Sequence, residues 1–152
     1  MTPEPFTIAV PDAELTDLRD RLVRARWPDA LPCAWADGTD RDWLRETCRY
    51  WADGFDWRAQ EAQLNDFAQF RAEIDGLQVH YVHQRSPEPD ARPLLLVHGW
   101  PGSFVEFRHL IGPLTDPVAH GGRAEDAFHV VCPSIPGYGF SEAPASHAFN
   151  GR

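Results

Sequence analysis

The spacing of apolar and polar residues along the 152-residue chain changes near residue 70. Before that point apolar side chains recur every three or four positions, which is the spacing of amphipathic helices. Three helix starts are predicted from capping residues, at Asp12, at Thr39 with Asp42 as a capping box, and at Asp56. We therefore expect a helical domain over residues 1–70 and a different domain over residues 71–152.

The second part of the chain has the patterns of strands. Ile74-Asp75-Gly76-Leu77 predicts a β-hairpin, because Asp-Gly tolerates the positive φ angles of a type I′ turn. The apolar runs 94–97 and 127–132 are typical of strands buried on both faces of a parallel sheet. Between them, a capping box starting at Ser103 predicts a helix that Gly112-Pro113 breaks. This order of hairpin, strand, helix and strand predicts the α/β class.

Composition and charge exclude several classes of protein. The 43% hydrophobic and 24% charged content is that of a globular chain, and the formal net charge of −9 disfavours nucleic acid and anionic membranes as partners. The three cysteines (Cys33, Cys48 and Cys132) include no C-x-x-C pair and predict neither a disulfide framework nor a metal site. With no signal peptide and no long apolar run, we expect a soluble cytoplasmic protein.

The run Leu94–Val97 leads into the turn His98-Gly99-Trp100-Pro101-Gly102-Ser103. Open α/β sheets bind ligands at the carboxyl ends of their strands, where this turn would lie. Glycines at 99 and 102 would let the backbone approach a substrate closely, and unpaired N–H groups ahead of a helix suit a developing oxyanion. On these physical grounds alone, a tight turn without chemistry explains the pattern equally well.

Six stretches in a consistent order resemble the microsomal-type epoxide hydrolases of the α/β-hydrolase fold. These stretches are residues 10–29, 55–67, 74–83, 98–107, 114–121 and 133–143. The resemblance spans essentially the whole chain. It implies a partial α/β-hydrolase fold preceded by a helical N-terminal segment. It also implies an enzyme that adds water to a small-molecule epoxide to give a vicinal diol, without a metal or an organic cofactor.

The resemblance also implies roles for particular residues. A nucleophilic Asp opens the epoxide while two lid tyrosines protonate its oxygen, and a His–acid pair then activates water to hydrolyse the ester. The backbone N–H of Trp100 would help to hold the oxyanion of the second step, and the Trp100–Pro101 bond would be cis. The turn would be shaped by His98, Gly99 and Pro101. Tyr138 and Phe140 could line the substrate pocket, or could equally pack their own loop.

The nucleophile of this mechanism is absent from the sequence. It should lie on a G-x-D-x-G or G-x-S-x-G elbow after the turn, and none follows Gly102. Asp56 lies in a similar stretch but precedes the turn and is better explained as a helix cap. His98 is interpreted as a structural residue, and His80 and His83 as surface residues that point to opposite faces of a strand and cannot share a metal.

We therefore interpret the chain as an N-terminal part of an epoxide hydrolase, inactive by itself. The alternatives are a non-catalytic remnant or binding module, and another hydrolase with an Asp nucleophile, such as a dehalogenase. The resemblance implies the strand order 1-2-4-3-5, of which the chain supplies the first four strands. The strand at residues 94–97 would then have an unpaired edge, so we expect the chain to self-associate rather than to form a stable monomer.

Overall fold

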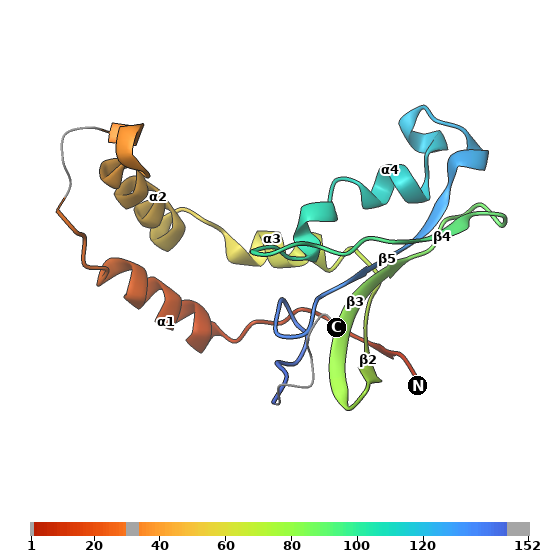
Figure 1. Ribbon diagram of the computed structural model, residues 1–152, viewed down its shortest axis with the longest axis horizontal. Helices are drawn as coiled ribbons and strands as arrows, with labels where there is room; N and C mark the ends of the chain where they lie inside the picture. Colours follow the sequence, from red (N-terminus) through yellow and green to blue (C-terminus); the bar gives the residue numbers. More distant parts are fainter. Residues whose placement is uncertain (1, 30–33, 146–152) are drawn as a thin grey trace. The chain divides into compact units, whose positions relative to one another are not determined.

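The computed structural model describes residues 2–29 and 34–145 of the chain. The chain packs as two compact units. The helical unit is Ala9–Glu61, and the sheet unit combines Met1–Ile8 with Ala62–Arg152. Figure 1 shows the helices of the first unit in red to yellow and the strands of the second mainly in green and blue.

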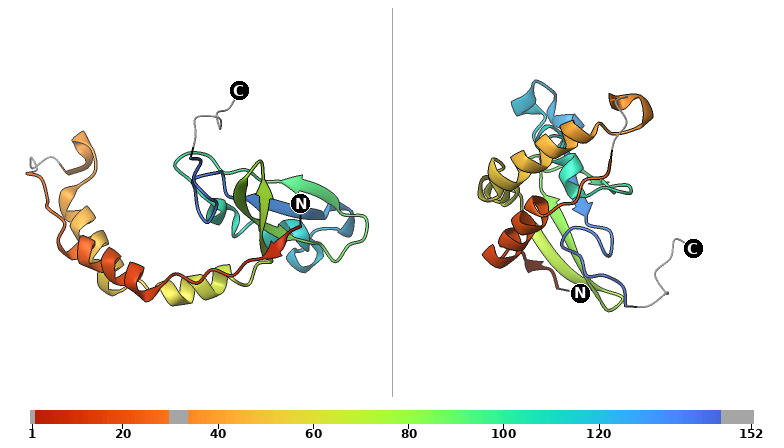
Figure 2. Two further views of the ribbon diagram at one scale, coloured as in Figure 1. Left: turned by 90° about the horizontal axis from the view of Figure 1, so that it is seen from below. Right: turned by 90° about the vertical axis from the view of Figure 1, so that its left-hand side faces the viewer.

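The helical unit contains α1 (Asp12–Val23), a 3₁₀ turn (Ala34–Asp37), α2 (Arg41–Asp53) and most of α3 (Trp57–Leu64). Helices α1 and α2 pack against each other, as the red and orange helices of Figure 2 show. The helical nature of this part of the chain is therefore as the residue spacing predicts.

The cap predicted for α3 is confirmed and that for α1 is wrong. The Asp56 carboxylate accepts a hydrogen bond from the Ala59 N–H at 3.0 Å, which caps α3. Pro11 occupies the N-cap position of α1, and Asp12 is already the first helical residue. The carboxylate of Asp12 makes no capping bond, because it binds the guanidinium of Arg58 instead.

The capping box predicted for α2 is also wrong. The N-cap residue is Asp40, whose carboxylate accepts a hydrogen bond from the Trp43 N–H at 2.8 Å. Asp caps a helix as well as Thr does, so an Asp one position further along the chain displaces Thr39 from this role. Asp42 then lies within the first turn, where its negative charge favours the helix N-terminus.

The sheet unit is built on five strands in the order β1-β2-β3-β5-β4. The strands are β1 (Glu4–Pro5), β2 (Gln69–Ile74), β3 (Leu77–Gln84), β4 (Arg92–Leu95) and β5 (Phe128–Pro133). Among these described strands, β4 and β5 alone pair in parallel, and the other neighbours are antiparallel. The α/β class and the relative order of the four predicted strands are confirmed, and β1 is an additional edge strand.

The predicted hairpin is confirmed in detail. Ile74 pairs with Leu77 at the end of the β2–β3 ladder. The two residues between them, Asp75 and Gly76, have φ angles of 49° and 79°. Positive φ at both positions defines the type I′ turn, so the register between β2 and β3 follows from this dipeptide.

The burial expected for the strand at residues 94–97 is wrong. This strand is β4, and it begins and ends two residues earlier than predicted. Leu95 is 62% exposed and Val97 is 53% exposed. Within the described residues β4 pairs with β5 alone. An apolar run is buried only where other elements cover it, and sequence spacing cannot supply that cover.

The helix predicted after Ser103 is divided into two pieces. A 3₁₀ turn covers Phe104–Phe107, and α4 covers Ile111–Thr115. The Gly112-Pro113 pair lies inside the first turn of α4 rather than breaking a helix. Proline is tolerated there because the first N–H groups of a helix have no partner within it. The 3₁₀ turns Val118–His120 and Ala124–Asp126 then lead to β5.

The core of the sheet unit is formed by residues from the strands, from the segment before the helical unit and from the segment between β4 and β5. The largest fully buried side chains include Phe104, Ile8, Ile111, His80, Val82 and Val130. The segment that follows the His98–Ser103 turn contacts β5 through both its 3₁₀ turn and α4. The turn is therefore held between a strand and a buried segment, which fixes its position.

Candidate functional site

The candidate site is the turn that follows β4. The parallel pairing with β5 continues to Leu96, whose N–H donates to the Val131 carbonyl at 2.9 Å. The Trp100–Pro101 bond is cis, the geometry that the resemblance implies. The Trp100 side chain is 82% exposed, and its backbone N–H makes no hydrogen bond with any described residue. The backbone N–H groups of His98, Gly99 and Gly102 likewise have no hydrogen-bond partner among the described residues, so the turn presents several unpaired backbone donors at the carboxyl end of a strand, that of Trp100 among them.

The two glycines of the turn have different surroundings. A Cβ at Gly102 would lie 1.7 Å from Glu106 Oε1 and 2.7 Å from the Gly99 carbonyl oxygen. A Cβ at Gly99 would meet no atom within 4 Å. Glycine at 102 is therefore required by the packing of the turn on its own atoms, whereas the space beside Gly99 is open.

A capping box closes the carboxyl side of the turn. The Ser103 hydroxyl accepts a hydrogen bond from the Val105 N–H at 3.3 Å, and the Ser103 N–H donates to Glu106 Oε1 at 3.2 Å. The element that follows is a 3₁₀ turn of four residues. Because few peptide dipoles align in so short an element, the positive field expected ahead of a long helix is reduced here.

His98, the first residue of the turn, is buried and makes two hydrogen bonds that hold the turn in place. Only 3% of its surface is exposed. Nε2 accepts a hydrogen bond from the Ile135 N–H at 3.1 Å, and Nδ1 lies 3.0 Å from the Gly99 carbonyl oxygen. Nε2 is therefore unprotonated and Nδ1 carries the proton that Gly99 accepts. With both nitrogens engaged, His98 fits the structural role rather than that of a base.

Tyr138 and Phe140 lie in the loop that follows β5, and both are half-buried. The Tyr138 ring packs edge-on against His98, with ring centroids 5.7 Å apart. The Phe140 ring packs against His80 and Phe6, each at 5.4 Å. Phe140 also lines a hollow of about 520 Å³. The arrangement shows how each ring packs, and their contact with a substrate stays a prediction.

An apolar hollow of about 580 Å³ lies in the helical unit. Its lining includes Leu15, Leu18, Tyr50 and Trp51 from α1 and α2. None of the residues predicted for the site contributes to it.

The interpretation of His80 as a surface residue is wrong. Its side chain has no exposed surface. The central strand β3 pairs with β2 on one side and β5 on the other, and residues on both of its faces are buried. The alternation of apolar residues predicts that the face with Leu77 and Val79 is buried and that the opposite face is exposed. His80 lies on that opposite face together with Val82, which is fully buried. That apolar neighbour two positions away is the signal that could have revealed the burial.

The environment of His80 keeps its ring neutral. Burial, and secondly the positive charge of Arg71, lower the pKa of His80 to about 4. Its two ring nitrogens lie 2.8 Å from Ser134 Oγ and 2.9 Å from Gln69 Oε1. His83, which the sequence also placed on the surface, is half-buried. Across the described residues, no three His, Cys, Asp or Glu side chains are grouped as a metal site.

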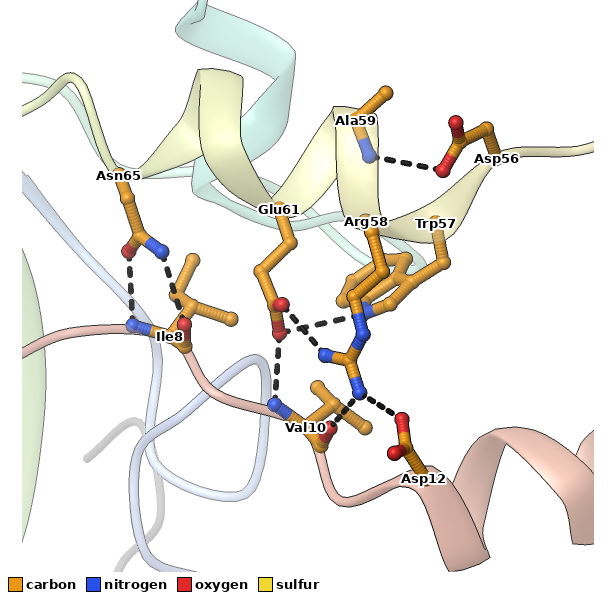
Figure 3. A network of polar contacts seen from close by, with 9 residues as sticks. All are labelled: Ile8, Val10, Asp12, Asp56, Trp57, Arg58, Ala59, Glu61 and Asn65. Carbon is orange, nitrogen blue, oxygen red and sulfur yellow. Dashed lines mark hydrogen bonds and ion pairs between the residues drawn. The ribbon is translucent and has the colours of Figure 1, made fainter.

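The Phe55-Asp56-Trp57-Arg58 stretch holds the segment that leads into α1. Figure 3 shows Glu61 Oε1 accepting the Val10 N–H at 2.7 Å, while Arg58 donates to the Val10 carbonyl at 2.8 Å. The hydrogen bond from Val10, more than the nearby Arg58, lowers the pKa of Glu61 despite its burial. These contacts give this stretch a structural role.

A similar arrangement lies in the sheet unit. The Asn65 side chain accepts the Ile8 N–H at 2.8 Å and donates to the Ile8 carbonyl at 2.9 Å (Figure 3). The side-chain amide thus pairs with the main chain of Ile8 as a neighbouring strand would.

No helix among the described residues is long and apolar enough to cross a membrane.

Comparisons with known proteins agree on one family. The family model described as "Epoxide hydrolase N terminus" matches residues 3–107, and that described as "alpha/beta hydrolase fold" matches residues 92–150. A putative epoxide hydrolase of Stigmatella aurantiaca is 50% identical over 147 residues, which cover 96% of this chain and 33% of that protein. Epoxide hydrolase 1 of Sus scrofa is 42% identical over 151 residues, with the same two coverages.

Two solved structures resemble the chain over nearly its whole length. The Aspergillus niger epoxide hydrolase has a TM-score of 0.80 and 39% identity, and the match covers 97% of this chain and 38% of that one. The juvenile hormone epoxide hydrolase of the silkworm Bombyx mori has a TM-score of 0.82 and 31% identity, with coverages of 95% and 35%. The chain spans about a third of the length of the curated relatives it matches.

Proposed function

Because this chain belongs to the epoxide hydrolase family and has a partial α/β-hydrolase fold, we propose that it supplies the oxyanion-binding turn of an enzyme that opens epoxides with water. The observation that carries the proposal is the unpaired backbone N–H of Trp100 at the carboxyl end of β4. An N–H held in place before the reaction stabilises an oxyanion without reorganisation.

In the proposed reaction, an Asp of the complete enzyme opens the epoxide and becomes esterified to the substrate. The partner His of the complete enzyme takes a proton from water as the water attacks the ester carbonyl, and the negative oxygen that forms accepts a hydrogen bond from the Trp100 N–H. Collapse of this intermediate breaks the bond between the carbonyl carbon and the substrate oxygen, which takes up the proton, so the diol leaves and the Asp carboxylate is restored. His98 holds the Gly99 carbonyl on one side of this donor, and the Ser103–Glu106 capping box closes the other. No motif in these 152 residues supplies the nucleophilic Asp or its partner His. The proposal therefore concerns an enzyme in which this chain is combined with the remainder of the hydrolase fold.

The remaining roles belong to the same proposal. Tyr138 and Phe140 line the pocket of a small-molecule epoxide, and Pro101 fixes the turn. Residues 1–70, which contain the helical unit, are the N-terminal domain, and residues 71–152 are the beginning of the hydrolase domain. The reaction uses neither a metal nor an organic cofactor.

A chimera tests this function. The matching third of the Stigmatella aurantiaca relative is replaced by this chain, and diol formation from styrene oxide is measured. We expect turnover by the chimera and none by the isolated chain, because only the chimera has a nucleophile. Release of halide from a haloalkane without diol formation would favour a dehalogenase, and a folded chimera without either activity would favour a binding module.

Two glycine variants of the chimera then test the role of the turn. Gly102→Ala places a methyl group against Glu106 and the Gly99 carbonyl, which displaces the Trp100 N–H. We expect the ester-hydrolysis step to slow by about 10²–10³, with the alkyl-enzyme accumulating in single-turnover mass spectra. Gly112→Ala is the matched control, because its methyl group meets only His120 at 3.4 Å. Equal rates for the two variants would contradict the proposed role of the turn.

A further inference from the structure

Two buried histidines hold the first two residues after β5. Ser134 and Ile135 are adjacent, and each makes a hydrogen bond with a different imidazole: Ser134 Oγ with His80 Nδ1 at 2.8 Å, and the Ile135 N–H with His98 Nε2 at 3.1 Å. Ser134 and His80 have no exposed surface, and His98 has 3%. We propose that His80 and His98 form a histidine clasp that sets the position of the loop 134–142, and that both are positioning residues for the candidate site.

The partners of Gln69 define the proton of His80. The Gln69 Nε2 donates to the Leu64 carbonyl at 2.9 Å and to Asn65 Oδ1 at 3.2 Å. Its Oε1 must therefore be the atom that faces His80, at 2.9 Å, and it can only accept. His80 Nε2 thus carries the proton, and His80 Nδ1 accepts the hydrogen of the Ser134 hydroxyl.

His98 has the opposite arrangement. A backbone N–H can only donate, so the Nε2 that faces Ile135 is unprotonated. The proton lies on Nδ1, which donates to the Gly99 carbonyl at 3.0 Å. The clasp therefore needs two neutral rings in different tautomers, each with an acceptor turned toward the loop.

The far end of the loop is bound to the same strand. Ser141 Oγ accepts the His80 N–H at 2.9 Å and donates to the Ser134 carbonyl at 2.7 Å. One residue later, the Glu142 N–H donates to the Gln78 carbonyl at 2.8 Å. Both ends of the loop are thus anchored at His80 and its neighbours, so the loop cannot shift as a rigid piece without breaking the clasp.

The clasp connects the loop to the oxyanion turn. His98 binds the Gly99 carbonyl on one side and the Ile135 N–H on the other, and the Tyr138 ring packs on it. A displacement of the loop would therefore be transmitted to the residue that precedes Trp100. This consequence for catalysis rests on the proposed function, whereas the clasp itself is a property of the chain and is tested without activity.

Hydrogen exchange with mass spectrometry on the 152-residue chain tests the clasp. We compare the variants Ser134→Ala and His98→Phe with the wild type, and follow the peptides that cover residues 134–142. Loss of one buried hydrogen bond should raise exchange there about tenfold. The matched controls are Ser86→Ala and His129→Phe. Ser86 is also a buried serine, and its backbone N–H donates a hydrogen bond to His129 Nδ1 at 3.0 Å, as the Ile135 N–H does to His98.

The control variants should leave residues 134–142 unchanged. Protection of these residues that survives both clasp variants, or that is absent from the wild type, would overturn the proposal. A variant that loosens the whole sheet would also raise exchange in the β2–β3 hairpin, so a second measurement uses the wild type alone.

That second measurement is magic-angle-spinning NMR of ¹⁵N-histidine-labelled wild-type chain, which works for monomers and assemblies alike. Two neutral rings are expected, with His80 protonated at Nε2 and His98 at Nδ1. Either ring in the other tautomer, or exchange between tautomers, would overturn the clasp. Because neither experiment measures turnover, failure of the clasp and failure of the proposed function would be told apart.

Discussion

At the scale of single residues, two independent features of the structure require glycine at position 139. Its φ of +52° lies in the left-handed region that residues with a Cβ rarely adopt. A Cβ there would also lie 2.6 Å from Ser134 Oγ, the atom that binds His80. Gly121 has a left-handed φ of +81° too, but a Cβ there would meet nothing within 4 Å.

Alanine variants of the two glycines can therefore separate the energetic cost of the left-handed backbone from the cost of steric contact with Ser134. Gly121→Ala should lower the free energy of unfolding by about 1 kcal/mol, the cost of the left-handed backbone alone. Gly139→Ala should cost roughly 1–3 kcal/mol more, because the Ser134 hydroxyl must also move. Urea unfolding followed by the β-sheet signal in circular dichroism measures both, and equal losses would show that Ser134 is not crowded.

Protonation of His80 should make the stability of the sheet unit depend on pH. The pKa of His80 is about 4 in the folded chain, against about 6.5 in an unfolded one. The unfolded state therefore binds more protons between these values. The free energy of unfolding should fall by roughly 3 kcal/mol as pH decreases from 6.5 to 4, and this group should add less than about 0.5 kcal/mol of further change below pH 4.

Urea titrations between pH 7.5 and 4 measure this dependence. The variant His80→Gln keeps a polar side chain without the titrating ring, so its loss of stability over the same interval should be smaller. A slope identical to that of the wild type would assign the pH dependence to other groups.

At the scale of elements, local sequence decides how each helix begins. Only one residue can occupy the N-cap position of α2, and Asp40 does so with its carboxylate 2.8 Å from the Trp43 nitrogen. Thr39, one position earlier, has no such bond among the described contacts of the helix. A shift of one residue therefore transfers the whole capping energy from one side chain to the other.

Alanine variants at these two neighbours should differ clearly. Asp40→Ala should lower the free energy of unfolding by about 1 kcal/mol, because an N–H of the first turn loses its partner. Thr39→Ala should change it by less than about 0.5 kcal/mol, as for other exposed positions. Thermal melts monitored by circular dichroism at 222 nm measure both effects, and a greater loss for Thr39→Ala would restore the capping box predicted from the sequence.

Elements governed by local chemistry were predictable, and those governed by distant partners were not. The Asp75-Gly76 turn contains all the information for the β2–β3 hairpin. The turn around Trp100 is also evident from the sequence, because glycines and a proline directly after an apolar run are typical of a tight turn. The burial of His80, in contrast, depends on pairing with β5, some fifty residues away along the chain. The histidine clasp follows from that pairing and has no local signature.

At the scale of the whole molecule, β4 is one of the two edges of the described sheet, and the two-residue strand β1 is the other. Within the described part of the chain, its second edge has no strand beside it, and Leu95 is 62% exposed. An exposed apolar edge strand is a template for pairing with another chain. We therefore retain the proposal that the isolated chain self-associates through β4.

A charge on this edge should reduce self-association. Leu95→Lys places a solvated ammonium beside the unpaired backbone, which disfavours pairing with a second sheet. Leu110→Lys is the control, since Leu110 is 50% exposed but lies outside the strands. Size-exclusion chromatography with light scattering should show a lower mass for Leu95→Lys alone. A monomeric wild type, or equal effects of both variants, would exclude β4 as the interface.

The sheet unit is assembled from both sides of the helical unit in the sequence, Met1–Ile8 before it and Ala62 onward after it. The first of these pieces contributes β1, the buried Ile8 and the ring of Phe6 against His80. A single proteolytic cut within the helical unit would therefore break the covalent connection without removing these contacts. The N-terminal piece would then be a peptide ligand of the sheet, held by the Asn65 amide and the β1–β2 ladder, and its exchange with a labelled peptide would report the strength of that attachment directly.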